Sequence, residues 1–199
     1  MDNELNQRIG RIYAALVHVI GPKVREVPVS ATQLGGLRFI EVDFRDGLSD
    51  EELSNRAHGV IHNVANLKGH LIRWSKSRGL TPGTVEQVVD GSPALKLVID
   101  LSNNDKHGYP PRDRGKSGLS PKLAGLDRWL SMATGPEAGS SVGFTMGPDG
   151  IGRIVGDGSA AIVITGRIID DHGSQLGDLD AVLLEAIEAW ERFLAQHAA

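Results

Sequence analysis

The chain has 199 residues, 40% of them apolar and 23% charged, with a net charge of −4 at pH 7. This composition is typical of a globular protein, and the absence of cysteine excludes disulfides, thiolate nucleophiles and cysteine-bound zinc. No stretch reaches about 18 consecutive apolar residues and the start lacks a signal-peptide pattern, so we expect a cytoplasmic protein with no membrane partner.

The spacing of apolar residues and the positions of capping and breaking residues predict an α+β fold. Long helices near 4–20, 50–78, 93–107 and 178–196 are expected to form a helical bundle, with a short helix near 84–90. Residues 23–47 include Pro28, Gly35 and Gly36, and they predict a loop with one or two short strands. From 126 to 169 the apolar period falls towards two between turn residues, which predicts a small antiparallel β-meander. Its first run, 126–133, also fits a helical turn.

We expect a single domain over residues 1–199. It would consist of a mainly helical part at 1–108, a basic loop at 109–125, the β-meander at 126–177 and a C-terminal helix at 178–199. The segment from Arg56 to Arg128 holds twelve Lys or Arg and six Asp or Glu, whereas the chain from Trp129 onwards holds three and ten. The middle of the chain therefore suits a polyanion, although two differently charged solvated faces explain the same counts more simply. The wide apolar face of the last helix is either internal or the contact of a homodimer.

Two helices carry the polar residues of the candidate site. The helix at 50–78 begins with a predicted capping box and repeats polar groups every four residues along one face, at His58, His62, Asn66 and His70. The helix at 93–107 is stopped by Gly108 and ends in the polar run Asn103-Asn104-Asp105-Lys106-His107. If the two helices pack antiparallel, we expect the face from His58 to Asn66 to lie opposite Asn103, Asn104 and His107 across a groove. The simpler interpretation is a frayed helix end, where His107 lies near the negative end of the helix dipole.

A metal site is the first alternative for these histidines. His58 and His62 are four residues apart, the spacing at which two imidazoles of one helix bind the same ion, and His70 or His107 would be the third ligand. A supporting carboxylate is usual at such a site, and residues 53–78 contain none. We therefore expect no metal and no cofactor, with the histidines on a hydrated or helix-facing polar stripe.

The polar end of the helix at 93–107 also resembles a known family. Asn103-Asn104-Asp105-Lys106-His107 is similar to the site of the HEPN superfamily, small helical bundles that include many toxin and defence ribonucleases, where an Arg and a polar residue are followed by a His. Asn103 stands at the position of the Arg. The run Asp-Leu-Ser-Asn-Asn-Asp-Lys-His-Gly further resembles an Asp-Leu-x-Asn-x-x-Lys-His signature of uncharacterised bacterial helical proteins. The resemblance covers about residues 50–108 and implies a metal-independent ribonuclease of a bacterial toxin–antitoxin or defence system.

In such a ribonuclease His107 would be the base, and Asn103, Asn104 and Lys106 would complete the catalytic cluster. Lys106, Arg56 or Arg73 would replace the missing Arg as the cation beside the phosphate. The expected substrate-binding residues are Arg56, His58, His62, Asn66, Arg73, Arg112, Arg114 and Lys116.

Two other functions fit the same residues. In the first, the protein is a catalytically inactive HEPN-like module, its polar cluster joins two helices, and its basic loop binds RNA or an acidic partner protein. In the second, a small molecule binds between the bundle and the sheet. The residues leave open whether the chain is an enzyme.

Overall fold

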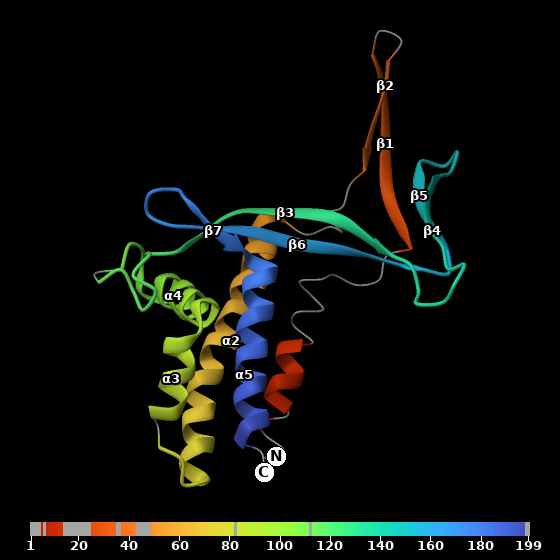
Figure 1. Ribbon diagram of the computed structural model, residues 1–199. Coiled ribbons are helices and arrows are strands. Elements are labelled where there is room, and N and C mark those ends of the chain that lie inside the picture. Colours follow the sequence, from red (N-terminus) through yellow and green to blue (C-terminus); the bar gives the residue numbers. More distant parts are fainter. Residues whose placement is uncertain are drawn as a thin grey trace.

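The structure is a computed structural model that describes residues 5, 7–13, 25–34, 37–42, 49–81, 83–111 and 113–197. It has the predicted α+β fold, with helices on one side of a long antiparallel ribbon (Figure 1). Within the described parts of the chain, none of the helices is both long and apolar enough to span a bilayer.

The helices are α2 (Asp50–Ser77), α3 (Gly83–Gly91), α4 (Pro93–His107) and α5 (Leu179–His197), and their ends lie within one residue of the predicted ones. Local capping explains this accuracy. The Ser49 hydroxyl accepts from the Glu52 backbone N–H at 3.2 Å, while the Ser49 N–H donates to the Glu52 carboxylate at 2.8 Å. Residues 7–13 are also helical, as predicted, and 14–20 lie outside the described residues.

The hydrophobic core joins the apolar faces of these helices to the inner face of β6. Trp190 and Phe193 of α5 are almost fully buried, and the Phe193 ring meets Trp74 of α2 edge-on at a centroid distance of 6.1 Å. The Trp190 indole N–H also donates to the Val64 carbonyl of α2 at 3.3 Å. The apolar face of α5 is therefore internal, which removes the reason for assigning it to a homodimer.

The strands form two sheets instead of one meander. A three-stranded antiparallel sheet contains β3 (Lys122–Ala133), β6 (Ser159–Ile169) and β7 (Gln175–Asp178) in the order β3-β6-β7. A four-stranded sheet has the order β2-β1-β5-β4 and contains β1 (Glu26–Leu34), β2 (Leu37–Val42), β4 (Val142–Met146) and β5 (Ile151–Gly156). Figure 1 shows the second sheet at the far end of the β3–β6 ribbon, away from the helices.

The predicted strand runs are correct, and β4 pairs antiparallel with β5 as a meander requires, but the expected pairing of β3 with β4 and of β5 with β6 is wrong. β3 pairs along its whole length with β6, so the β4–β5 hairpin between them leaves the ribbon and joins β1. Gly156 allows this exit because its φ is +97° and a Cβ there would lie 2.2 Å from the Ser141 carbonyl oxygen. The run at 126–133 is strand, which excludes the helical turn, and residues 122–125 of the expected loop also belong to β3.

The segment at 23–47 contains two strands, and both are longer than the short strands that the sequence predicted. β1 and β2 pair from Val29 opposite Val42 to Leu34 opposite Leu37. Pro28 is tolerated because it precedes this ladder and faces only β5, where it lies opposite Ile151. The part expected to be mainly helical, 1–108, therefore also contains a β-hairpin.

Candidate functional site

The end of α4 presents two polar faces to different parts of the protein. Ser102, Asp105 and Lys106 are three and four residues apart and face α2. The same spacing places Asp100, Asn103, Asn104 and His107 on another face, along a groove closed by the following loop. The expected single cluster is therefore divided, and Asn103, Asn104 and His107 do not face the histidines of α2.

On the first face, α2 contributes His58, His62 and Asn66. The His62 imidazole has two partners on α4, the Ser102 hydroxyl at 2.8 Å from Nδ1 and the Asp105 carboxylate at 2.8 Å from Nε2. His58 Nδ1 lies 3.5 Å from the other carboxylate oxygen of Asp105. One turn further along α2, Asn66 accepts a hydrogen bond from the Lys106 ammonium at 3.2 Å. We call His58, His62 and Asp105 the histidine–aspartate cluster.

On the second face, α4 fixes the loop that follows it. The buried Asp100 carboxylate accepts hydrogen bonds from the backbone N–H groups of Lys116 at 2.8 Å and Ser117 at 2.7 Å. The Asn104 amide donates to the Pro121 carbonyl at 2.7 Å. Gly115 has a φ of +75°, and a Cβ there would lie 2.5 Å from the Asp100 carboxyl carbon. The loop can approach α4 this closely only with glycine at 115.

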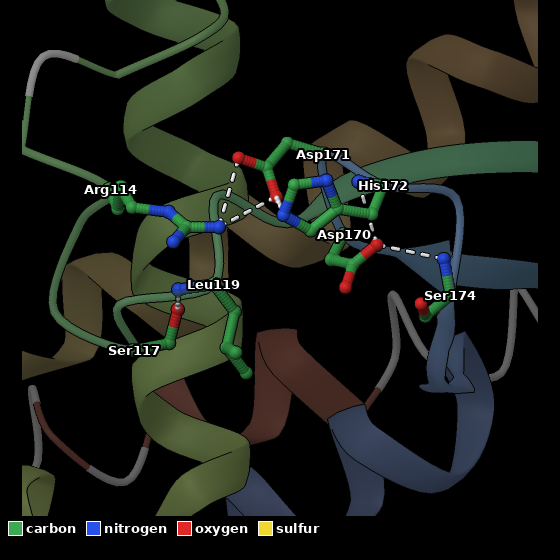
Figure 2. A network of polar contacts seen from close by, with 7 residues as sticks. All are labelled: Arg114, Ser117, Leu119, Asp170, Asp171, His172 and Ser174. Atoms are coloured by element: carbon green, nitrogen blue, oxygen red, sulfur yellow. Dashed lines mark hydrogen bonds and ion pairs between the residues drawn. The ribbon is translucent and has the colours of Figure 1, made fainter.

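Two basic side chains of this loop, those of Arg114 and Lys116, are paired with acidic residues. The Arg114 guanidinium donates to the Asp171 carboxylate in the turn after β6, with N–O distances of 2.8 and 3.0 Å. Figure 2 shows this contact. The Lys116 ammonium lies 2.8 Å from the Glu86 carboxylate of α3 and 3.7 Å from Asp90. Arg112 lies outside the described residues. The loop is therefore a weaker polyanion site than its sequence suggests, because nearby acids offset its described cations.

The Glu86 carboxylate bridges two lysines. Its pKa is lowered from the ordinary value of 4.5, first by the hydrogen bond from Lys116 and then by that from Lys68, whose Nζ lies 2.7 Å from Oε1. The same contact with Glu86 raises the pKa of Lys116 above 10.5, so this lysine is a cation at neutral pH.

We expect the Glu86 carboxyl group to titrate below pH 4.5 in the folded protein, as followed by the chemical shift of its carboxyl carbon. Because the folded pKa is lower than the unfolded one, the bridge stabilises the protein fully above the unfolded pKa, and this stabilisation is lost as the pH falls through the folded pKa. Lys116→Met should move the pKa of Glu86 back towards 4.5, and Lys76→Met, at an exposed position of α2, should leave it unchanged. A Glu86 pKa that does not respond to Lys116→Met would contradict this account.

The α4 groove has a volume of about 740 Å³, within the usual range for small-ligand sites. Its lining residues are Asp100, Asn103, Asn104, His107, Gly108, Tyr109, Pro110, Pro111, Asp113, Gly115 and Lys116. The side chains of Asn103 and His107 are exposed and have no hydrogen-bond partner among the described residues. The His107 imidazole, the Asn103 amide and the Lys116 ammonium therefore line one groove together with two carboxylates, and these groups suit acid–base chemistry on a polar ligand.

The other predicted cations lie away from this groove. Arg73 contacts the neighbouring His70 at 2.6 Å, Arg56 is exposed on α2, and Lys106 is held by Asn66. A second, smaller pocket of about 300 Å³ lies between α2 and β3 beside His58, at the place expected for a pocket between bundle and sheet.

The sequence prediction assigned no role to three residues that organise the site. Asp105 supplies the carboxylate that α2 lacks, Asp100 fixes the loop, and Glu86 holds Lys116. Helical periodicity places Ser102, Asp105 and Lys106 on one face, so this part of the site could have been found in the sequence.

Comparisons with protein-family models, curated proteins and solved structures find no match to this chain.

Proposed function

We propose that this protein is a HEPN-like, metal-independent ribonuclease that binds single-stranded RNA in the α4 groove. One observation carries the proposal: His107 and Lys116 line the same groove, although they are nine positions apart in the sequence. Tyr109 also lines it and is 39% exposed, which offers a surface on which a base can stack.

The chemistry follows from these groups. His107 takes the proton of a ribose 2′-hydroxyl, whose oxygen then attacks the adjacent phosphorus. The bond from phosphorus to the 5′-oxygen breaks, water supplies the proton for this leaving group, and a 2′,3′-cyclic phosphate remains. Lys116 stabilises the negative charge on the non-bridging oxygens, and the Asn103 amide donates a hydrogen bond to one of them. Lys116 thus takes the role that the sequence suggested for Lys106, Arg56 or Arg73.

A second candidate is the catalytically inactive module that binds RNA without cutting it. The pairing of Lys116 with Glu86 and Asp90 favours it, since these carboxylates offset the charge that cleavage requires. Lysine also offers a point charge where the family's Arg has a planar fork of donors.

We expect the purified protein to cut single-stranded RNA in the presence of EDTA and to leave 2′,3′-cyclic phosphate ends. His107→Ala should lower the cleavage rate by about 100-fold or more, the lower range for loss of a general base. His172→Ala is the matched control, because this exposed histidine lies in the turn after β6 and does not line the groove. RNA with a 2′-deoxy sugar at the cleaved position should resist cleavage by the wild type and by His172→Ala, because it lacks the attacking hydroxyl.

The outcomes separate the two candidates. RNA binding that weakens with rising salt, without cleavage, would reject the ribonuclease and support the inactive module. Neither binding nor cleavage would reject both. Cleavage that His107→Ala leaves unchanged would place the activity outside this groove or in a contaminant.

A further inference from the structure

The histidine–aspartate cluster gathers three metal-ligand types at the contact of α2 with α4. One potential ligand atom from each of His58, His62 and Asp105 lies within 4.8 Å of the other two. Two nitrogen or oxygen ligands of a tetrahedral zinc ion, each about 2.05 Å from the metal, lie roughly 3.3 Å apart. His62 Nε2 lies 2.8 Å from one oxygen of the Asp105 carboxylate and His58 Nδ1 lies 3.5 Å from the other oxygen, so both nitrogens lie near this separation from the carboxylate.

The surroundings of the His58 ring provide a second, independent observation. Its Nδ1 atom is buried from solvent and has no hydrogen-bond partner among the residues that the structure describes, although it lies 3.5 Å from a carboxylate oxygen of Asp105. A buried ring nitrogen without a partner is costly unless something satisfies it. A cation between His58 Nδ1 and Asp105 would satisfy it directly.

The surroundings of His62 fit the same role. Its Nδ1 lies 2.8 Å from the Ser102 hydroxyl, and in the tautomer that donates a proton to this hydroxyl the Nε2 lone pair points at the Asp105 carboxylate, where a metal ion would accept it. Metal-binding histidines are usually held by such a contact on the other ring nitrogen. The nearest described ammonium on this face of α4, that of Lys106, is bound to Asn66.

We propose that His58, His62 and Asp105 bind one divalent transition-metal ion of the zinc type, which links α2 to α4. Two imidazole nitrogens and one carboxylate oxygen suit zinc, cobalt or nickel better than magnesium or calcium. The three side chains are 24–40% exposed, so an ion can enter and water can complete its coordination. The site lies on the face of α4 that turns away from the groove of His107, and the proposal is independent of ribonuclease activity.

The test is a titration of the full, tag-free chain with Co²⁺ and with Zn²⁺ after treatment with EDTA and its removal. We expect one ion per chain, a visible cobalt spectrum of low coordination number, and a Zn²⁺-dependent rise in Tm. Asp105→Asn and His62→Ala should each weaken binding by at least tenfold and abolish the rise in Tm. Ser102→Ala, which removes only the support of His62, should weaken binding by about tenfold.

His107→Ala and His172→Ala are the controls, because each removes a histidine outside the cluster, and both should bind metal as the wild type does. Circular dichroism in EDTA checks that every variant is folded, and His58→Ala replaces any variant that is not. The proposal is overturned if the folded wild type shows no saturable binding. It is equally overturned if His107→Ala or His172→Ala weakens binding as much as His62→Ala. Ribonuclease activity is measured separately in EDTA, so failure of one proposal leaves the other standing.

Discussion

Replacing Asp100 with alanine is expected to lower the free energy of unfolding by about 3 kcal/mol. The carboxylate is 1% exposed and accepts two backbone hydrogen bonds, from Lys116 and Ser117. Hydrogen bonds to charged groups contribute roughly 1.5–3 kcal/mol each, and the variant leaves both N–H groups without their acceptor. Urea unfolding followed by circular dichroism measures the change, and the loop should also exchange its amide protons faster.

Two further variants test whether the contact between Asp100 and the loop causes the loss of stability. Asp113→Ala removes an exposed carboxylate of the same loop that accepts a single longer bond, 3.3 Å from the Gly115 N–H, and should change stability by less than about 1 kcal/mol. Gly115→Ala should be destabilising because its Cβ meets the Asp100 carboxylate. In the double variant Asp100→Ala/Gly115→Ala that clash is absent, so the losses of stability caused by these two substitutions should be less than additive. Full additivity would contradict the close contact.

Replacing Trp190 with alanine should cost about 4 kcal/mol, the middle of the usual range for a large aromatic residue in a core. The side chain is 1% exposed and binds the Val64 carbonyl, so the variant leaves a cavity between α5 and α2 and removes a hydrogen bond. Thermal or urea unfolding monitored by circular dichroism reports the loss without relying on tryptophan fluorescence.

Leu184 provides the matched control on the same helix. It is 52% exposed, and Leu184→Ala should change the free energy of unfolding by no more than about 0.5 kcal/mol. Trp190→Phe keeps most of the volume and loses the indole N–H, so its cost should fall between those of the two alanine variants. Equal costs for Trp190→Ala and Leu184→Ala would mean that α5 is not packed against α2 as described.

The helices could be predicted from the sequence because their limits depend on nearby residues. Ser49, Ser92 and Gly108 begin or end a helix through contacts within four positions along the chain. The strand runs were visible for a similar reason, since turn residues mark them. The partner of each strand was not visible, because an alternating pattern shows which face is buried and is equally compatible with β4 or β6 beside β3.

The contact between the polar residues of α2 and the end of α4 was predicted, but the residues that make it were not. The polar residues of α2 and the end of α4 do meet, but through Ser102, Asp105 and Lys106, while Asn103, Asn104 and His107 line a different groove. Periodicity separates these faces, and it does not tell which of them a distant helix will contact. The pairing of Lys116 with Glu86 was likewise out of reach, because it depends on how α3 packs beside the loop.

The pairing of β1 with β5 affects how the chain can fold. Glu26 lies opposite Arg153, so the N-terminal hairpin gains its second neighbour only after most of the chain has been synthesised. Until then one edge of β1 has no partner, and contacts between such distant segments form slowly because a long loop must close first. During synthesis on the ribosome, this hairpin is therefore the described element exposed for the longest time to pairing with other chains.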